Sequence, residues 1–173
     1  WLREYHVDGF RLDAVHALAD SSAKHILEEI AERVAEEAQR TGKDLVTIAE
    51  SDLNDPRMIA ATHRHGLGMD AQWLDDVHHA AHTAFTGETQ GYYGDFASLH
   101  ALEKTMHTAY FHNGTYSTFR GRSHGREIDP VEQRPYQFVT FLQNHDQVGN
   151  RAAGDRMNQS MSVDRAIAAA TWL

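Results

Sequence analysis

The stretch HVDGFRLDAVHALADSSAKHILEEIAERVAEEAQRTGKDLVTIAE, residues 6–50, decides the fold class of this chain. Apolar residues recur at helical spacing over residues 21–41, which predicts an amphipathic helix. Short apolar runs on either side, within residues 6–15 and 44–50, predict two strands. A strand, a helix and a second strand in this order form a βαβ unit, in which the two strands run parallel.

The alternation of strands and helices continues along the rest of the chain. Ser21 or Ser22 can cap the first helix, and Gly42 can end it. The other expected elements are a short helix from Pro56, a strand within 68–73, helices over 75–86 and near 95–108, an irregular stretch over 110–135, a strand over 136–143 and a helix from about Ser162. Repeated βα units predict an α/β fold, either a doubly wound sheet or a (β/α)8 barrel.

The composition limits the class of protein. The 173 residues suffice for one domain, and the apolar content of 41% and charged content of 24% are ordinary for a globular protein. A net charge of −9, with histidine counted neutral, argues against nucleic-acid and anionic-membrane partners. The chain has no cysteine, which excludes disulfides and thiolate chemistry. We expect a cytoplasmic protein that binds neither nucleic acid nor membrane, and its oligomeric state stays open.

Three predicted strands end in carboxylates, namely Asp13, Glu50 and Asp146. In parallel α/β folds, functional groups gather at the carboxyl ends of the strands. One such residue is often a cap or a turn residue, but three convergent cases favour a site. Arg11 and Asp13 should point to the same face, because side chains alternate along a strand. A guanidinium there would keep the carboxylate ionised, as a nucleophile requires, and the alternative is a structural ion pair.

Glu50 follows an apolar run and has no basic neighbour in the sequence. We therefore expect apolar surroundings and a second carboxylate nearby, which together raise the pKa of a carboxyl group and keep it protonated as a general acid. Two carboxyl groups with these different roles are the usual catalytic residues of glycoside hydrolases. The adjacent His145 and Asp146 would then hold the hydroxyls of the reacting sugar, with Asn144 as their scaffold.

Three motifs resemble ordered motifs of the α-amylase family of glycoside hydrolases. They are DGFRLDAVH (8–16), TIAESD (47–52) and FLQNHDQ (141–147), which lie in that family at the ends of barrel strands four, five and seven. The resemblance implies part of a (β/α)8 TIM barrel, about strands 4 to 7 with the intervening helices. The implied site consists of Asp13 as nucleophile, Glu50 as acid/base and Asp146 as transition-state stabiliser, supported by Arg11, His16 and His145.

Three longer stretches, residues 49–57, 68–96 and 114–126, narrow the resemblance within that family. They are similar to the members that cleave the α-1,4-glucosidic bond next to the terminal trehalose of maltooligosyl trehalose and release trehalose. This implies a retaining double-displacement hydrolysis of that substrate or a related α-glucan, with no cofactor and no required metal. The residues implied in substrate recognition are Trp73, Asp75, Asp76, His78 and His79, with Tyr92 and Tyr93 as platforms that stack on sugar rings or simply pack.

The family's first motif, at the end of barrel strand three, has no counterpart in this sequence. We therefore expect residues 1–173 to form a single partial catalytic barrel domain, truncated at both ends. A half barrel exposes unpaired strand edges. On its own, the chain is expected to be poorly folded and inactive.

Other functions compete with this interpretation. His78 and His82 stand four residues apart on a predicted helix with Asp75 one turn earlier, a spacing that could chelate zinc. The metalloprotease glutamate is absent after the first histidine, so an exposed or substrate-facing helix surface is favoured. Another α-amylase-family activity, such as α-glucan hydrolysis, debranching or branching, stays open. A non-catalytic carbohydrate-binding relative is disfavoured, because it would be expected to lose catalytic carboxylates and all three are present.

Overall fold

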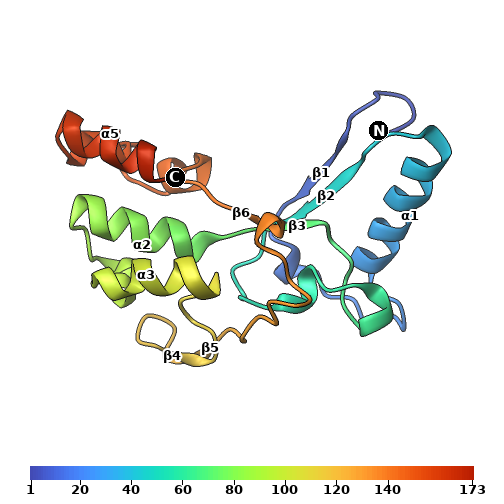
Figure 1. Cartoon of the computed structure of the whole chain (residues 1–173), viewed down its shortest axis with the longest axis horizontal. Coiled ribbons are helices and arrows are strands. Elements are labelled where there is room, and N and C mark those ends of the chain that lie inside the picture. Colours follow the sequence, from blue (N-terminus) through green and yellow to red (C-terminus); the bar gives the residue numbers. More distant parts are fainter. The chain divides into compact units, whose positions relative to one another are not determined.

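A computed structural model describes residues 1–173, which form two compact units. Unit 1 consists of Trp1–Trp73 and Ile128–Val139, and unit 2 consists of Leu74–Glu127 and Thr140–Leu173. Figure 1 labels the helices and strands of both units. None of the helices combines the length and the hydrophobicity that crossing a lipid bilayer requires.

Unit 1 is built on a four-stranded sheet in the order β1-β2-β3-β6. Every neighbouring pair of strands runs parallel, which confirms the predicted parallel α/β arrangement. The strands are Gly9–Leu12 (β1), Val46–Ala49 (β2), Ala71–Trp73 (β3) and Phe138–Val139 (β6). Gly9 suits the start of β1, because a Cβ atom there would lie 2.1 Å from the backbone oxygen of Val46.

The last strand of the sheet is much shorter than the predicted strand over 136–143. Only Phe138 and Val139 pair with β3, where their partners are Gln72 and Trp73. The preceding residues, Pro135–Gln137, form a 3-10 helix (η5) instead of extended chain. Apolar residues after Val139 therefore belong to unit 2 and not to the sheet.

The register of the sheet separates its two faces. Arg11 pairs with Ile48, and Ile48 pairs with Ala71. Side chains alternate along a strand, so these three residues point to one face, together with Trp73 two residues further on. Leu12 and Ala49 point to the opposite face, which carries the apolar core of unit 1. Arg11 therefore lies on the face of the sheet away from this core.

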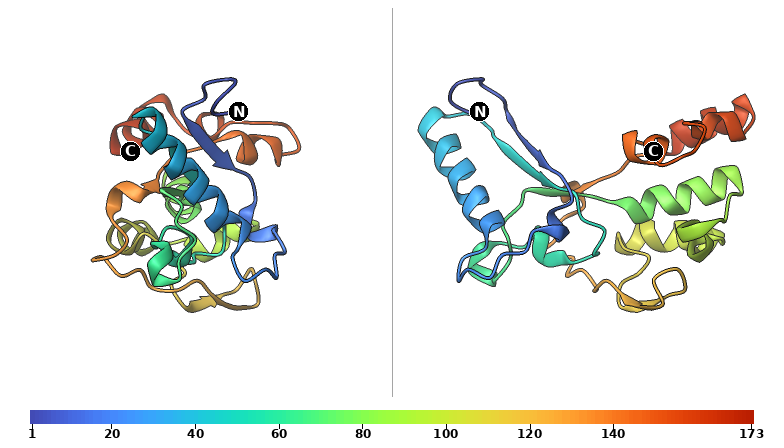
Figure 2. Two further views of the ribbon diagram at one scale, coloured as in Figure 1. Left: turned by 90° about the vertical axis from the view of Figure 1, so that its right-hand side faces the viewer. Right: turned by 180° about the vertical axis from the view of Figure 1, so that it is seen from behind.

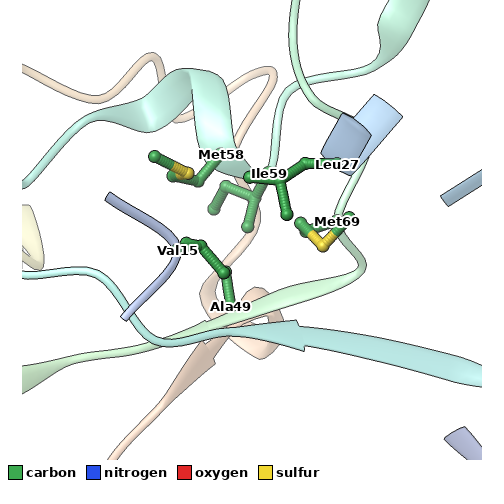
Figure 3. Packing of buried hydrophobic residues seen from close by; sticks show 6 residues of the cluster. All are labelled: Val15, Leu27, Ala49, Met58, Ile59 and Met69. Carbon is green, nitrogen blue, oxygen red and sulfur yellow. The ribbon is translucent and has the colours of Figure 1, made fainter. Parts of the chain in front are cut away.

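The core of unit 1 gathers side chains from several elements against the sheet. Figure 3 shows its six buried members, Val15, Leu27, Ala49, Met58, Ile59 and Met69. Leu27 comes from the helix Ile26–Thr41 (α1), Val15 from the 3-10 helix Val15–Ala17 (η1) and Met58 from the 3-10 helix Pro56–Met58 (η2). A further 3-10 helix, Thr62–Arg64 (η3), has no buried residue. This packing fixes α1 against the sheet on the side away from Arg11.

The two ends of α1 compare differently with the prediction. Gly42 ends the helix as predicted, with a positive φ of 68° and its N–H donating to Ala38 O at 2.8 Å. The start was predicted wrongly, because His25 and not a serine is the N-cap and accepts from the N–H of Leu27. Asp20 accepts from the N–H groups of Ser22 and Ile26, at 2.9 and 2.6 Å, and so holds the preceding loop. Asp20, and not Ser21 or Ser22, therefore accepts the backbone hydrogen bonds that order the chain before α1.

Unit 2 is mainly helical. Its helices are Asp75–Thr86 (α2), Leu99–Thr108 (α3), His145–Gly149 (α4) and Val163–Trp172 (α5), with 3-10 helices Gly91–Phe96 (η4) and Met157–Ser160 (η6). An apolar cluster is formed by Ala80 of α2, Phe96 of η4 and Ala101 of α3. Both ribbon figures draw α2 beside α3 (Figures 1 and 2). The predicted helices over 75–86 and from Ser162 are confirmed, whereas the helix near 95–108 begins only at Leu99.

The stretch predicted to be irregular, 110–135, contains an antiparallel hairpin. Its strands are Thr115–Ser117 (β4) and Arg122–His124 (β5). Asp95 holds the turn, since its carboxylate accepts from the hydroxyl of Ser117 at 2.6 Å and from the N–H of Thr118 at 3.1 Å. The hairpin was missed because its strands are short, polar and mostly exposed, and so show no apolar alternation.

Candidate active site

Arg11 joins two carboxyl groups at the carboxyl end of the sheet in unit 1. Its Nη1 lies 2.6 Å from Asp13 Oδ1, and its Nη2 lies 3.0 Å from Glu50 Oε2. The side chain of Asp13 is 79% exposed, whereas those of Arg11 and Glu50 are 23% and 17% exposed. One guanidinium therefore anchors an accessible carboxylate and a half-buried one at the ends of adjacent strands.

The surroundings of Glu50 are polar, which corrects the prediction of apolar surroundings. Besides Arg11, the N–H of Ala14 donates to Glu50 Oε2 at 2.7 Å. A guanidinium and an N–H donor both favour the ionised carboxylate. The sequence did not reveal these partners, because they reach Glu50 from β1 and from the turn that follows β1.

Ala14 was not among the predicted site residues, although it links the two carboxylate-bearing strand ends. Its φ of 42° and ψ of 45° lie in the left-handed region, which residues with a Cβ atom rarely adopt. This conformation accompanies the N–H contact to Glu50, and the N–H of Val15 donates to Glu50 O at 3.0 Å. Strained backbone of this kind tends to occur at functional sites, but an alanine in the sequence gives no sign of it.

The ring of Trp73 stacks on the guanidinium of Arg11. Arg11 Cζ lies 3.9 Å from the centroid of the Trp73 ring, which is a cation–π contact. Trp73 is the last residue of β3, two strands away from Arg11 in the sheet. The residue predicted to recognise substrate thus contacts the arginine that holds the two carboxylates.

His16 lies in the short helix η1, directly after the turn at Ala14. Its Nε2 is 3.6 Å from Asp52 Oδ1, and both side chains are about one-third exposed, at 32% and 37%. The carboxylate of Asp52 orients the imidazole of His16 and was not identified from the sequence. The structure therefore groups Arg11, Asp13, His16, Glu50 and Trp73 within unit 1.

In unit 2, Asn144 begins a helix instead of ending a strand. Its Oδ1 accepts from the N–H of Asp146 at 2.8 Å, and Gln147 Oε1 accepts from the N–H of Asn144 at 2.9 Å. These two bonds form the capping box of α4. His145 Nε2 lies 3.4 Å from Asp146 Oδ1, with side chains 71% and 37% exposed. Asn144 thus fixes the start of α4, the helix that carries His145 and Asp146.

The sequence resemblance implied that Asp76 contacts substrate, whereas in the structure its carboxylate binds backbone N–H groups. The residue is buried, and its Oδ2 accepts from the N–H groups of Phe111 and His112 at 2.7 and 3.0 Å. These bonds hold residues 111–112 against α2. Its neighbour Asp75 is half-buried in the first turn of the same helix.

His78 and His82 of α2 are buried, so the prediction of an exposed or substrate-facing surface is wrong for these two residues. His78 Nδ1 contacts the backbone oxygen of Leu142, and its Nε2 lies 2.9 Å from the Tyr93 hydroxyl. His82 stacks on the Tyr93 ring, with centroids 4.2 Å apart. The prediction failed because η4 and the chain near Leu142 cover this face of α2.

Burial determines the protonation of this histidine cluster. Desolvation lowers the pKa of His78 from 6.5 to about 4, and it lowers the pKa of His79 well below the ordinary value. Burial also lowers the pKa of His82, although Glu88, 2.7 Å from its Nε2, opposes the shift. No group of three or more histidine, aspartate or glutamate side chains is placed to hold a metal ion. The cluster therefore acts as a neutral, hydrogen-bonded core.

The two tyrosines proposed as sugar platforms differ in exposure. Tyr93 is buried and packed between His78 and His82, so its ring belongs to the core of unit 2. Tyr92 is half-buried, with its ring centroid 4.6 Å from that of His79. It lines a cavity of about 420 Å³ together with Glu88, Gln90, Asn150 and Arg151.

Comparison with known proteins defines first the class and then the particular kind of protein. No family model matches the chain. A crystal structure from Salmonella typhimurium, named as an alpha amylase, matches 96% of this chain with a TM-score of 0.85 and 39% sequence identity, over 28% of its own length. The chain is therefore an α/β structure with a parallel sheet, similar to part of an alpha-amylase-type protein.

The particular relatives are named malto-oligosyltrehalose trehalohydrolase. The protein from Arthrobacter ramosus is 56% identical over 98% of this chain and 29% of its own length. Those from Rhizobium sp. (strain M-11) and Saccharolobus solfataricus are 53% and 49% identical, over 93% and 91% of this chain and 27% of their own lengths. The chain is a homologue of one part of the malto-oligosyltrehalose trehalohydrolases, and it spans less than a third of their length. The resemblance predicted from the motifs is confirmed.

Proposed function

We propose that the protein containing this chain is a glycoside hydrolase that cleaves the α-1,4-glucosidic bond next to the terminal trehalose of maltooligosyl trehalose. The observation that carries this proposal is the contact of one guanidinium, that of Arg11, with both Asp13 and Glu50. The names of the relatives support trehalose as the product. We also propose that the protein is cytoplasmic, as expected from its composition, and the substrate is the only partner proposed.

We further propose that β1, β2, β3 and β6 correspond to barrel strands four to seven of one partial catalytic domain over residues 1–173. The order of these strands and their parallel register support the correspondence. Asp13 and Glu50 then stand at the ends of barrel strands four and five. The carboxyl ends of barrel strands are where the active sites of such barrels are built.

In the proposed reaction, a carboxylate oxygen of Asp13 attacks the anomeric carbon of the maltooligosyl chain. The bond to the trehalose oxygen breaks as Glu50 gives that oxygen a proton, and trehalose leaves. Water then attacks the glycosyl-enzyme, Glu50 takes up its proton, and Asp13 is released as a carboxylate. The high exposure of Asp13 and the contact of Arg11 support its role as nucleophile.

The retaining mechanism is proposed from the resemblance of the motifs, and the separation of the two carboxyl groups in the complete protein tests it. Because Arg11 contacts both carboxyl groups, they are kept close together. Retaining pairs lie about 5 to 5.5 Å apart, while inverting pairs need about 6.5 to 9.5 Å to admit a water molecule. Glu50 needs a proton before it can act as an acid. The nearby negative charge of Asp13 favours the protonated form of Glu50, whereas the positive charge of Arg11 favours the ionised form.

The remaining predicted site residues are proposed to bind the sugar. Asp146 and His145 would hold hydroxyls of the reacting ring, since the cap at Asn144 fixes the start of α4 and both side chains reach solvent. His16, oriented by Asp52, would lie beside the leaving group. Asp75 and Tyr92 stay proposed recognition residues, because both are accessible in part.

The test uses the complete protein that contains these 173 residues. Maltotriosyl trehalose and a maltooligosaccharide of equal length are offered separately, and trehalose, shortened chains and the anomer first formed are followed by NMR. Rapid trehalose release with the α anomer formed first is expected. Equal cleavage of both substrates would favour a general α-glucan hydrolase, and an initial β anomer would contradict the retaining mechanism.

A further inference from the structure

We propose that Trp73 is a positioning residue that holds the Arg11 guanidinium where it contacts both Asp13 and Glu50. The inference rests on the proposed glycosidase function for its catalytic consequence. It assigns Trp73 an action through Arg11, in place of the direct substrate contact implied by the sequence resemblance.

The sheet places Trp73 where it can act on Arg11. The register joins Arg11 to Ile48 and Ile48 to Ala71, and Trp73 lies two residues beyond Ala71 on the same face. The arginine side chain must therefore extend over β2 and toward the carboxyl end of the sheet to reach the ring. Its Cζ lies 3.9 Å from the ring centroid, which is full contact between the two groups.

The carboxylates and the ring constrain different parts of the guanidinium. Asp13 and Glu50 meet Nη1 and Nη2, which lie at the edge of the planar group. Contacts at the edge leave the group free to tilt, and an arginine side chain has many rotamers through which to do so. The ring of Trp73 covers a face of the guanidinium and opposes that tilt. Tryptophan is the aromatic residue that attracts a cation most strongly.

Loss of this ring should act on catalysis through the carboxylates. A guanidinium that can tilt does not hold both of its contacts at the same time, so Asp13 and Glu50 are no longer fixed relative to one another. Such misplacement affects the chemical step more than ground-state binding of substrate. A ring that bound sugar directly would instead contribute to substrate affinity.

The test is a double-mutant cycle in the complete protein that contains this chain. Trp73→Leu removes the ring, Trp73→Phe keeps a smaller one, and Arg11→Lys keeps the charge without the planar group. Trp73→Leu is expected to lower kcat on maltotriosyl trehalose by about tenfold, within the range of a desolvated cation–π contact, with KM changed by less than about twofold. Trp73→Phe should restore kcat to within about threefold of the unmodified protein.

The cycle is completed in the Arg11→Lys background. There, Trp73→Leu should lower kcat by less than about twofold, because the planar group on which the ring acts is gone. Trp172→Leu is the matched control, since Trp172 belongs to α5 and its ring faces Phe85 in unit 2. That variant should keep kcat unchanged and reports the general effect of losing a tryptophan.

Two further measurements do not depend on turnover. Crystal structures of Trp73→Leu and Trp73→Phe should show Arg11 displaced from Glu50 in the first and retained in the second. Affinity for maltotriosyl trehalose, measured by calorimetry in the Asp13→Asn background, should be the same with and without Trp73→Leu. If wild-type protein cleaves neither test substrate, the proposed function fails, and the crystal structures still decide the inference about Trp73.

Three results would overturn the inference. One is an unmoved Arg11 in the Trp73→Leu structure. Another is an equal loss of kcat from Trp73→Leu in the wild-type and Arg11→Lys backgrounds. The third is weaker substrate binding with kcat preserved, which would make Trp73 a sugar-binding residue.

Discussion

Among single residues, Arg11 is the one on which the candidate site of unit 1 depends. It contacts the carboxyl groups of Asp13 and Glu50 and the ring of Trp73, although each partner lies on a different strand end. A planar group with several fixed donors suits this task better than a single ammonium. The chemistry of the two carboxylates is therefore coupled through one side chain.

The roles proposed for the two carboxylates can be separated by the leaving group. Glu50→Gln is expected to lower trehalose release by about 10² to 10⁴, the usual contribution of general acid–base catalysis. A maltosyl fluoride substrate needs no proton on its leaving group, so formation of the glycosyl-enzyme from it should be nearly normal. Stopped-flow measurement of fluoride release in the complete protein makes this comparison.

Asp13→Asn provides the matched contrast with Glu50→Gln. Without a nucleophile, both maltotriosyl trehalose and the fluoride should be inert, while circular dichroism should remain that of the wild type. If Asp13→Asn kept full activity on either substrate, Asp13 would not be the nucleophile. An equal loss on both substrates for Glu50→Gln would contradict its role as acid.

The strained conformation of Ala14 gives a prediction about stability. With φ at 42°, Ala14→Gly should leave the free energy of unfolding unchanged or raise it by up to about 1 kcal/mol, because glycine adopts this region without strain. Ala14→Val should lower it by about 1 to 3 kcal/mol, because a β-branched residue is disfavoured there. Urea unfolding of the complete protein measures both. Equal effects of the two substitutions would exclude backbone strain as the cause.

The sequence predicted contacts within one strand better than contacts between strands. Arg11 and Asp13 are two residues apart, so alternation alone brings them to one face. The contacts of Arg11 with Glu50 and Trp73 depend on the order and register of β1, β2 and β3. Periodicity along the chain carries no information on either, and so Glu50 was expected to lie in apolar surroundings.

At the scale of elements, α2 organises unit 2 by anchoring a loop at its first turn. Asp76 accepts from the N–H groups of Phe111 and His112, which follow α3 in the chain. One of these hydrogen bonds is buried and the other is partly buried. Without the carboxylate, the two N–H groups would have neither this acceptor nor ready access to water. The carboxylate of Asp76 is thus one of the groups that hold the return from α3 to the hairpin, together with Asp95, which lies 3.2 Å from His112 Nε2.

Replacement of that carboxylate should loosen the loop. Asp76→Ala is expected to lower the free energy of unfolding by about 1 to 3 kcal/mol, because two N–H groups lose their acceptor. Hydrogen exchange at Phe111 and His112 should become faster by mass spectrometry of the complete protein. Glu103→Ala on α3, where the side chain is 69% exposed, is the control and should change neither quantity. Unchanged exchange in Asp76→Ala would show that other contacts hold the loop.

The elements that were predicted well are those with local signals of their own. The helix over 75–86 has helical periodicity and ends before Gly87, and the last helix has Ser162 as its N-cap. The hairpin β4–β5 depends on Asp95, which is distant in the chain, and could not be found from local pattern. The apolar run over 136–143 was taken as one strand because composition does not show where pairing stops.

At the scale of the whole molecule, the buried histidines of unit 2 make stability depend on pH. His78 has a pKa of about 4 in the folded chain against an ordinary value of 6.5, so the unfolded chain binds more protons between these values. Stability is therefore full above about pH 6.5 and falls as the pH drops toward 4, by up to about 3 kcal/mol from this residue. His79 and His82 act in the same direction.

The urea midpoint of the complete protein at pH 7.5 and pH 5 tests this dependence. The midpoint should fall on acidification, and His78→Gln should reduce the size of the fall, because a glutamine does not titrate. His100→Gln, at a side chain 72% exposed, is the control and should preserve the wild-type dependence. A fall that is the same in all three proteins would place its origin outside the histidine cluster.

The two units are interleaved along the chain, which has a consequence for synthesis. The sheet of unit 1 needs β6, which the ribosome delivers only after residues 74–127 of unit 2. Unit 2 in turn waits for residues 140–173. Neither unit can be completed before part of the other has been synthesised. On the nascent chain, β3 therefore remains an open edge of the sheet until β6 has been made. A single cut anywhere between residues 74 and 139 would leave both units divided between two pieces.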